Sequence, residues 1–458
     1  YCARLVCKIV LLEILLKCDT ILAIYFRINL LMSHIFMKSI SPVLYAVVWI
    51  SALWFSSANA LDITITQGSE TAQPIAVAPF PGSDVVTNDL RLSGEFAPLT
   101  QSQMVSTPTQ LSEVNFSDWR MLDIPTLLVG RVVDGEKGKM LEFQLINVYR
   151  QKIILHYRFP LGDGNERRVR DTAHVISDLV YKALTGIEGA FRTHIAYISL
   201  LRKGGGKRSY TLEVADADGA NVQVLLRSPF PLLSPSWSPD GRRLAYVSFE
   251  NGRSEVWMHD IYSRKRSIIA NFKGKNSAPA WSPDGKSMAL SLSLDGNSEI
   301  YVMNLKSEKL RRLTKNRGAD TEPAWSADGK KIVFLSDRSG RPQLYSMNLS
   351  GGRASRVTFK GRYSTSPDIS PDGSQITFLN GEGGRYRIAV MDVGRSGMRL
   401  LTSNQQDESP SFSPNGRMIV YATQKSGRGV LEIVSVDGGS VQQLTLRGKD
   451  VREPVWSP

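Results

Sequence analysis

A motif of the form Trp-Ser-Pro-Asp-Gly returns at a nearly constant interval along the C-terminal half of the chain. Successive copies are separated by 44, 44, 44, 43 and 44 residues. The aromatic or apolar residue that opens each copy lies at Trp237, Trp281, Trp325, Ile369, Phe412 and Trp456. Short apolar runs follow each motif, as in LAYVS at 244–248 and EVWMHD at 255–260. Four short strands in a repeat of about 40–50 residues are typical of a β-propeller blade.

The last copy of the motif, PVWSP at 454–458, is incomplete. The strand that would follow it occurs instead at IAYIS, residues 195–199. Residues 194–458 number 265, which is close to six periods of 44. We therefore predict an all-β, six-bladed β-propeller over 194–458. Its C-terminal strand is expected to pair with the first propeller strands, an arrangement called Velcro pairing, so that no inner edge stays unpaired.

The residues of the motif have structural explanations. In Ser-Pro-Asp-Gly, proline fixes φ at the first corner of a turn, aspartate suits the second corner, and glycine adopts the left-handed conformation that closes it. The tryptophans recur once per repeat at one position. We therefore interpret them as blade-packing residues rather than as a row of ligand contacts.

Residues 61–193 do not repeat, and their pattern changes between strand and helix periods. This alternation predicts a small N-terminal α/β domain ahead of the propeller. The expected elements are a buried strand at 74–80, a helix at 85–94, a hairpin at 126–148 that turns at 134–136, and a helix at 167–186.

Residues 37–60 have the composition of a secretory signal peptide. They combine a lysine near the start, an apolar run shorter than a membrane span, and an Ala-x-Ala cleavage pattern. The predicted cleavage lies between Ala60 and Leu61. We therefore expect the mature protein to be exported.

Residues 1–36 are interpreted separately from the signal peptide. They begin with tyrosine, and charged residues interrupt their apolar stretches. We interpret them as sequence translated from upstream of the true start, which would be Met32 or Met37. The alternative is a genuine additional membrane anchor.

The net charge and the cysteine content limit which partners this chain can bind and which kinds of chemical site it can contain. The formal net charge is +13, but the basic residues are scattered among acids in pairs such as Arg242 and Arg243. This distribution favours a solvated basic surface over a phosphate track, so we predict no nucleic-acid partner. Beyond residue 18 no disulfide, zinc–cysteine site or thiol nucleophile is available, because the cysteines are Cys2, Cys7 and Cys18.

No residue pattern indicates a metal site, a cofactor or a catalytic centre. No Gly-x-Ser-x-Gly nucleophile elbow occurs. RKGGGKRS at 202–209 lacks the leading glycine of a phosphate-binding loop and lies between two predicted strands, so we interpret it as a hairpin turn. The histidines beyond the signal segment lack metal-ligand spacing: His156, His174, His194 and His259. We predict no enzymatic activity and no cofactor.

Function is therefore expected to reside in recognition. In a propeller, the loops that lead into the innermost strands gather at one mouth of the central channel, where partners commonly dock. Here these loops mix hydroxyl, carboxylate and basic side chains: Asn276, Ser277, Thr321, Glu322, Thr365, Asp407, Glu408, Arg452 and Glu453. From the residues alone, a docking surface and simple solvated strand caps remain equally open interpretations.

Residues 61–458 resemble the TolB family of the Tol–Pal envelope system of Gram-negative bacteria. The most specific stretch is ALTGIEGAFRTHIAYIS at 183–199. Support comes from SFENGRS at 248–254, DTEPAWSADG at 320–329, SGRPQLY at 339–345 and the ending PVWSP. The resemblance implies a non-enzymatic periplasmic adaptor that supports outer-membrane integrity and constriction at cell division.

The resemblance also implies partners and positions. The lipoprotein Pal is expected at the propeller mouth, which would hold the protein peripherally at the outer membrane; outer-membrane porins and lipoproteins are further expected partners. Lys275 stands where relatives often carry histidine. The expected Pal-binding residues are Lys275, Asn276, Ser277, Ala278, Thr321, Glu322, Thr365, Glu408, Arg452 and Glu453. TolA is expected to bind the start of the mature chain by strand addition, through Leu61, Asp62, Ile63, Thr64 and Ile65.

Two other classes of function are weighed beside the adaptor. A propeller that binds a sugar or another small ligand would need no protein partner. A propeller-gated hydrolase would need a catalytic domain with a nucleophile elbow, and residues 61–193 are too few and carry none.

Overall fold

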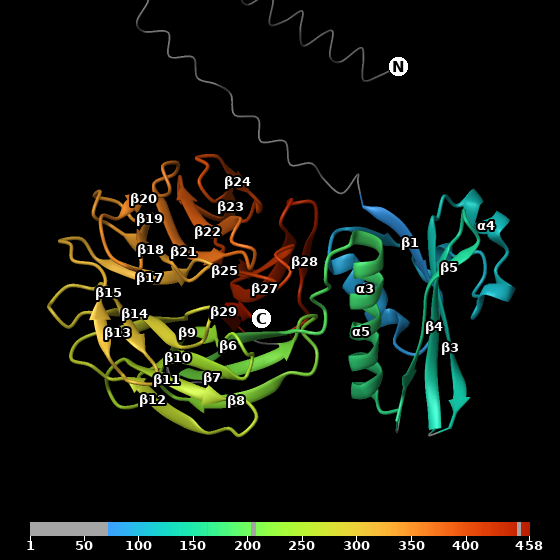
Figure 1. Cartoon of the computed structure of the whole chain (residues 1–458), viewed down its shortest axis with the longest axis horizontal. Coiled ribbons are helices and arrows are strands. Elements are labelled where there is room, and N and C mark those ends of the chain that lie inside the picture. The colour runs from blue at the N-terminus through green and yellow to red at the C-terminus, as the bar shows by residue number, and fades with distance from the viewer. Residues whose placement is uncertain (1–71, 137, 163, 203–207, 447–449) are drawn as a thin grey trace, which may run out of the picture. The chain divides into compact units, whose positions relative to one another are not determined.

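The structure is a computed structural model, and it describes residues 72–136, 138–162, 164–202, 208–446 and 450–458. The expectations for the upstream segment, the signal peptide, its cleavage site and the TolA-binding residues 61–65 therefore lie outside the described residues. The described part holds a five-stranded sheet with helices and a ring of six four-stranded sheets (Figure 1). The predicted fold class, a small α/β domain followed by a six-bladed propeller, is confirmed.

The N-terminal sheet is mixed. Its first three strands pair in parallel and the last two pair antiparallel. Across the sheet the strands are ordered β2 (Phe96–Pro98), β1 (Gln73–Val77), β3 (Thr126–Gly135), β4 (Gly138–Asn147) and β5 (Lys152–Pro160). β1 is shorter than the predicted strand at 74–80, since Pro79 and Pro81 lack the N–H that a sheet ladder needs.

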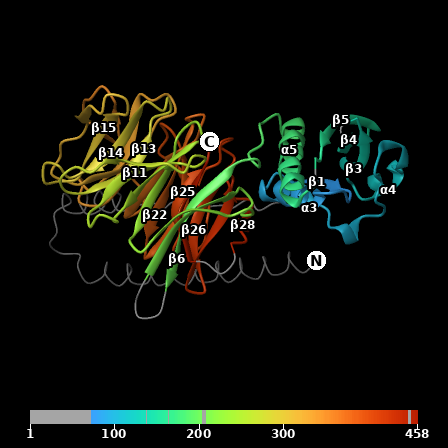
Figure 2. The ribbon, with the colours of Figure 1, turned by 90° about the horizontal axis from the view of Figure 1, so that it is seen from below.

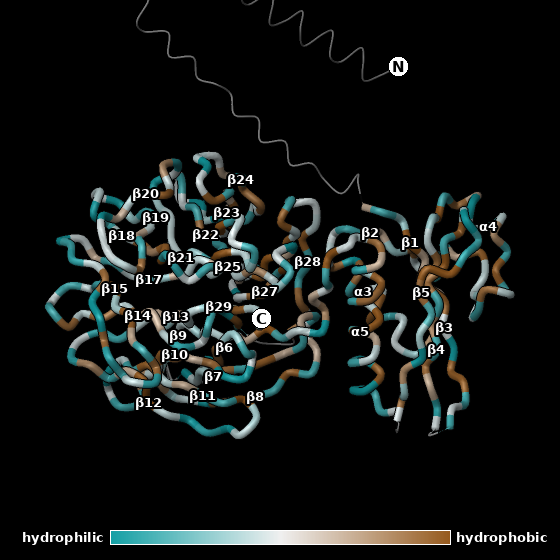
Figure 3. Tube along the Cα trace, viewed as in Figure 1, coloured by the Kyte–Doolittle hydropathy of each residue, from teal (hydrophilic) through white to brown (hydrophobic). Residues whose placement is uncertain are grey.

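Two amphipathic helices cover one face of this sheet. They are α3 (Ser83–Leu92) and α5 (Glu166–Thr185), and both carry alternating hydrophobic and hydrophilic segments in Figure 3. α5 begins where the Asn165 side chain accepts the Arg168 N–H, and it ends at Gly186 in the left-handed conformation. These boundaries agree with the helix predicted at 167–186.

The opposite face of the sheet is covered only in part. The short helix α4 (Phe116–Met121) buries Trp119 completely against Leu127, Val129 and Ile146 of the sheet. Two 3-10 turns, η1 (Gln101–Gln103) and η2 (Leu111–Glu113), lie in the connection before it. The sequence patterns did not predict α4, β2 or β5, because α4 and β2 are short and β5 alternates only over residues 155–159.

Each sheet of the ring has four strands. The innermost strands, which surround the centre of the ring in Figure 1, are β29 (Asp450–Trp456), β9 (Leu232–Trp237), β13 (Asn276–Trp281), β17 (Asp320–Trp325), β21 (Tyr363–Ile369) and β25 (Glu408–Phe412). The second strands are β6 (His194–Arg202), β10 (Arg243–Ser248), β14 (Ser287–Leu292), β18 (Lys331–Ser336), β22 (Gln375–Glu382) and β26 (Met418–Lys425).

In each blade the third strand is as long as the second, and the outermost strand is shorter. The third strands are β7 (Arg208–Asp216), β11 (Glu255–Asp260), β15 (Glu299–Asn304), β19 (Gln343–Asn348), β23 (Arg385–Asp392) and β27 (Arg428–Ser435). The outermost strands are β8 (Gln223–Ser228), β12 (Arg266–Ala270), β16 (Leu310–Arg312), β20 (Ser355–Arg356), β24 (Met398–Leu400) and β28 (Val441–Gln443). Figure 2 shows several of these strands after a quarter turn.

The C-terminal strand closes the ring as predicted. β29 pairs antiparallel with β6, and Trp456 lies opposite Ile195. Ser457 strengthens the junction, since its N–H donates to the His194 carbonyl at 2.8 Å. The blade that contains PVWSP is thus completed by strands from the other end of the propeller, and the inner edge of β6 is paired.

The repeated motif performs the roles that its residues predict. In the first blade turn, the Ser238 hydroxyl donates to Asp240 Oδ1 at 2.5 Å, and Gly241 has φ 65°. The motif tryptophans are 4–8% exposed. Three of their ring nitrogens donate to a carbonyl of the preceding blade: Trp237 to Val455 at 3.2 Å, Trp281 to Ser236 at 3.3 Å, and Trp325 to Ala280 at 3.0 Å. These residues therefore hold adjacent blades together.

Candidate functional site: the channel and its mouth

The six innermost strands line a central cavity of about 720 Å³. We call the end where the loops enter these strands the mouth. The sequence predicts that the candidate binding residues gather there. The structure brings residues from all six innermost strands to the wall of one cavity, including Ala278, Glu322, Thr365, Glu408 and Glu453.

Every innermost strand contains the same backbone irregularity. One residue before a proline adopts a left-handed conformation with φ between 49° and 52°. The six positions are Ser234, Ala278, Glu322, Ser366, Ser409 and Glu453. Each lies at a shift in register between the innermost and second strands, which is a β-bulge. Non-glycine residues rarely adopt this conformation, and such strain collects at functional sites.

Acidic side chains on these bulges bind the next blade. Glu322 Oε2 accepts the Ser366 N–H at 2.7 Å and also the Thr365 hydroxyl. Glu453 Oε2 accepts the Ser234 N–H in the same way. The carboxylates thus compensate backbone donors at the bulges of neighbouring blades. The signal for this ring in the sequence is the x-Pro step that recurs in every repeat, and it was not among the predicted site features.

The channel acids also influence each other's ionisation. Burial raises the pKa of Glu453 to about 7, and the charges of Glu408 and Glu322 act in the same direction, against the Ser234 N–H. Burial likewise raises the pKa of Glu408. Burial raises the pKa of Asp368 to about 6, although that carboxylate accepts the Phe412 N–H at 2.7 Å. Burial therefore disfavours the ionised form of these carboxyl groups in the channel.

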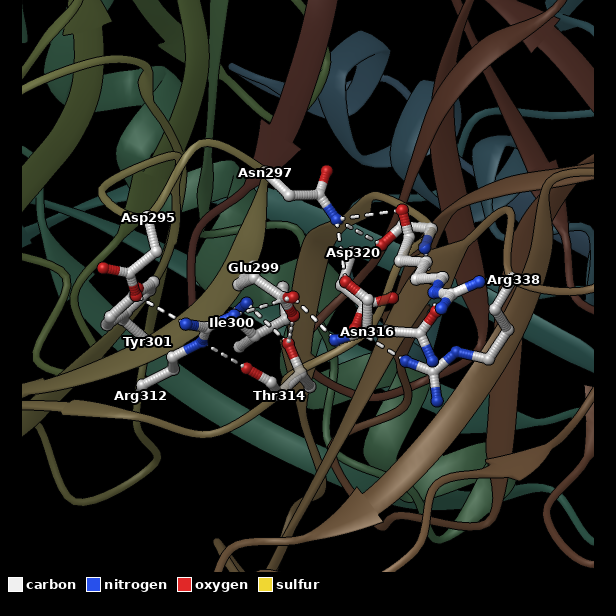
Figure 4. Close-up of polar contacts among 12 residues, drawn as sticks. Asp295, Asn297, Glu299, Ile300, Tyr301, Arg312, Thr314, Asn316, Asp320 and Arg338 are labelled. Carbon is white, nitrogen blue, oxygen red and sulfur yellow. Dashed lines mark hydrogen bonds and ion pairs between the residues drawn. The ribbon is translucent and has the colours of Figure 1, made fainter.

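The mouth loop before β17 is held by a continuous polar network (Figure 4). The Thr314 hydroxyl accepts the Ile300 N–H at 2.9 Å and donates to Glu299 Oε2 at 2.6 Å. Glu299 Oε1 accepts the Asn316 N–H at 2.7 Å, and Asn297 donates to the Gly318 carbonyl at 2.7 Å. The loop ahead of Thr321 is thus held in one conformation before any partner binds.

The predicted Pal-binding residues fall into three classes of exposure. Lys275 is exposed. Seven are half-buried: Ser277, Ala278, Thr321, Glu322, Glu408, Arg452 and Glu453. Two are buried, Asn276 and Thr365.

Asn276 supports its loop from inside rather than offering a free side chain. Its amide nitrogen donates to the carbonyls of Phe272, Gly274 and Ser254. Its Oδ1 accepts the Phe272 N–H at 3.0 Å. Its place among the expected Pal-binding residues stays a prediction, and the structure assigns this side chain a supporting role in the loop, which sequence position alone does not reveal.

Apolar residues near the mouth were not among the predicted site residues. Phe230 is 44% exposed and Leu233 is 37% exposed in the segment that enters the innermost strand β9. Phe359, in the loop before β21, is 63% exposed, with the Arg356 guanidinium 5.1 Å from the centre of its ring. Exposed aromatic residues beside preformed polar loops are typical of protein interfaces.

One group of metal-ligating side chains occurs in the described part of the chain, away from the channel. Asp89, His174 and Asp218 offer ligand atoms within 4.8 Å of one another. His174 Nδ1 lies 2.8 Å from Asp89 Oδ2, and Arg170 pairs with Asp218. Burial lowers the pKa of His174, but the bond to Asp89 and the nearby acids outweigh it and raise that pKa to about 9. Two cations thus balance two carboxylates, and the cluster joins α3 and α5 to the β7–β8 turn.

Among the described residues, no helix is long and apolar enough to cross a membrane.

Comparisons with known proteins agree over both parts of the chain. A family model described as the TolB beta propeller domain matches residues 181–458, and one described as the TolB amino-terminal domain matches residues 61–154.

Two curated relatives are named Tol-Pal system protein TolB. The one from Thioalkalivibrio sulfidiphilus is 48% identical over 48% of this chain and 52% of its own length, and the one from Hydrogenovibrio crunogenus is 42% identical over 52% and 57%. The chain thus spans about half the length of the curated relatives it matches. The crystal structure of TolB from Acinetobacter baumannii is similar with a TM-score of 0.79 and 38% identity, covering 84% of this chain and 97% of that one.

Proposed function

Because this chain belongs to the TolB family, a non-enzymatic component of the Tol–Pal system, we propose that it is a periplasmic adaptor that binds Pal at the propeller mouth and TolA through residues 61–65. In this role it would support outer-membrane integrity and constriction at cell division. The sequence of residues 37–60 supports export to the periplasm.

The observation that carries the Pal site is the combination of exposed aromatic residues on two mouth loops with the hydrogen-bonded loop before β17. Phe359, in the loop before β21, and Phe230, in the loop before β9, each expose apolar surface at the mouth, on loops that are separated by three blades. Lys275 and Arg452 supply positive charge from two other mouth loops, and the half-buried Thr321 adds a hydroxyl. A preformed apolar and polar surface loses little conformational entropy on binding, which favours a stable complex.

The test is a calorimetric titration of residues 61–458 with the soluble domain of Pal from the same organism. We expect Phe359→Ala to weaken binding by at least about tenfold, which corresponds to about 1.4 kcal/mol. The matched control is Tyr262→Ala. Tyr262 is 69% exposed in the turn after β11, and Arg242 of a motif turn lies over its ring, which places it at the end of the propeller opposite the mouth. Melting temperatures of both variants should equal that of the parent.

Three results would count against this site. Equal loss in the Phe359 and Tyr262 variants would show that the mouth is not the surface used. Lys275→Glu without any effect would remove the loop before β13 from the interface. Failure of the folded parent to bind Pal would overturn the adaptor function and favour a small ligand in the 720 Å³ channel.

The TolA part of the proposal rests on alternation in the sequence. Leu61, Ile63 and Ile65 alternate with the polar residues Asp62 and Thr64, as a strand added to a partner's sheet requires. We expect Ile63→Asp to abolish binding to the C-terminal domain of TolA, measured by calorimetry. Thr64→Asp, on the other face of the same strand, should reduce it much less. Equal effects of the two substitutions would exclude strand addition.

A further inference from the structure

β5 forms an open edge of the N-terminal sheet. Among the residues that the structure describes, β4 is its only strand partner. β5 is nine residues long, whereas β2 at the other edge has three. An open edge presents a row of unpaired backbone N–H and C=O groups, which can pair with another strand. β5 can therefore pair with an added strand over nine residues, whereas β2 offers only three.

The two faces of β5 have different chemistry. Leu155 and Phe159 pack against the core beneath α5, and Tyr157 stacks on Phe143 with ring centres 5.9 Å apart. Tyr157 remains 45% exposed. The other face carries His156 and Arg158. A strand laid beside residues 155–159 would thus meet apolar side chains on one face and His156 and Arg158 on the other. A register shift between residues 153 and 155 puts Lys152 on the apolar face.

The cationic face surrounds a single acid. Glu142, whose side chain is 3% exposed, binds Arg131 at 2.8 Å, His156 at 2.9 Å and Arg158 at 2.7 Å. The side chains of these three partners are themselves 36%, 43% and 57% exposed. One carboxylate cannot neutralise the two guanidinium groups of Arg131 and Arg158, so positive charge remains directed toward solvent.

The surplus of positive charge extends along the edge. Residues 147–161 contain no acidic residue, while Arg150, Lys152 and Arg158 are basic. Lys152 is exposed and makes no ion pair within the described part of the chain. Two copies of β5 placed side by side would repel each other, which disfavours self-association through this edge. An acidic strand would be attracted to it.

We propose that β5 is a docking edge for an extended acidic segment of a partner protein, which adds as a sixth strand to the sheet. Its side chains would alternate, because successive residues of a strand point to opposite faces. Acidic residues would face His156 and Arg158, and apolar residues would extend the row of Leu155, Tyr157 and Phe159. This surface is separate from the mouth and from residues 61–65, so it goes beyond the proposed function.

The probe is a fluorescein-labelled peptide of alternating glutamate and valine, about eight residues long, added to residues 61–458. We expect saturable binding by fluorescence anisotropy, which weakens with salt because the charged groups are exposed. A peptide of the same composition with all glutamates in one block should bind at least about tenfold more weakly. Alternating lysine and valine should not bind. Amide hydrogen exchange should slow across residues 152–160 when the alternating peptide is bound.

Variants of the protein separate strand addition from general attraction. Lys152→Glu, and Lys152→Glu with Arg158→Gln, should weaken binding by about tenfold or more. The matched control makes the same charge changes at exposed cations of propeller strands, Lys331→Glu with Arg311→Gln, and should leave binding unchanged. The Lys152 variant alone keeps the test valid if loss of the Arg158–Glu142 pair unfolds the sheet. Equal binding of the block peptide, equal loss in the control variant, or unchanged exchange across β5 would overturn the proposal.

Discussion

The propeller and the N-terminal sheet differ in what happens to their strand edges and in how they hold buried acids. In the propeller, β29 covers the inner edge of β6, and the acids of the channel accept backbone N–H groups from the next blade. In the sheet, β5 stays open, and Glu142 is bound by two arginines and a histidine. The two regions are therefore suited to different kinds of recognition.

Closure of the ring and openness of the sheet lead to different binding surfaces. A closed ring fixes its loops, so a partner at the mouth meets a surface that already exists. An open sheet offers backbone groups that become ordered only when a strand is added. Glu142 and Glu453 also differ in the charges around them. Arginines lie beside Glu142, whereas other acids lie near Glu453.

Removal of the closing strand β29 should reduce the stability of the protein more than the other changes considered below. A chain that ends at Lys449 lacks β29, so the inner edge of β6 loses its partner and the core that contains Trp456 and Val451 opens. We expect the cooperative unfolding transition of the propeller to disappear in calorimetry. A chain that ends at Ser457, without the exposed Pro458, should melt as the parent does. Melting of the shorter chain at the parent's temperature would show that closure does not stabilise the ring.

The second prediction concerns Glu142 of the sheet. Burial opposes its ionisation, but hydrogen bonds from His156, Arg131 and Arg158 outweigh that cost and lower its pKa to about 2. Its contribution to stability is therefore present above pH about 4.5 and is lost as the pH falls toward 2. Because its partners are partly exposed, we expect Glu142→Gln to lower the free energy of unfolding by about 2 kcal/mol at pH 7.

Urea unfolding at pH 7 and pH 3 measures this effect. The difference between parent and Glu142→Gln should shrink at pH 3, because the carboxylate is then protonated in the unfolded chain while it is still mostly ionised in the folded protein. Glu136→Gln, an exposed position in the same hairpin, serves as the control and should change little. A difference that stays constant between the two pH values would mean that Arg131, His156 and Arg158 do not act through the charge of Glu142.

The smallest change in the free energy of unfolding is expected at Glu453 of the channel. There the ionised carboxylate destabilises the fold, whereas at Glu142 it stabilises the fold. Its pKa is raised from 4.5 to about 7, so the folded state holds the proton more tightly than the unfolded chain. Stability should therefore be fully present below pH about 4.5 and fall as the pH rises toward 7. Glu453→Gln keeps an acceptor for the Ser234 N–H and cannot ionise.

We expect this variant to equal the parent at pH 5 and to exceed it by about 1 kcal/mol at pH 8, measured by urea unfolding. Glu308→Gln, an exposed position in the turn after β15, is the matched control. If the variant is less stable than the parent at pH 8, the hydrogen bond to Ser234 outweighs the cost of burying the charge, and the contrast with Glu142 fails.

The repeat made much of the propeller predictable. Trp456 and Gly241 each belong to a motif whose neighbours along the chain define a turn, and a fixed period counts the blades directly. β5 was not predicted, since KIILHYRFP alternates between apolar and polar residues only over residues 155–159, after the adjacent apolar residues Ile153 and Ile154. Its existence as a strand depends on pairing with β4.

The sequence indicated which loops form the candidate site, but not which of their side chains are exposed. The loops that carry Lys275, Thr321 and Glu453 were identified from the period. The inward turn of Asn276 and the exposure of Phe359 were not, because both depend on groups outside the motif.

The number of blades, the closure of the ring by its last strand and the family all follow from the order of residues, because each is carried by local motifs at fixed spacing. Which mouth residues face solvent, and how each acid is held, became settled only in the folded chain. Glu453, for example, binds Ser234 across 219 residues of chain. Ionisation and exposure depend on every group that folding brings near, and short sequence motifs do not specify those neighbours.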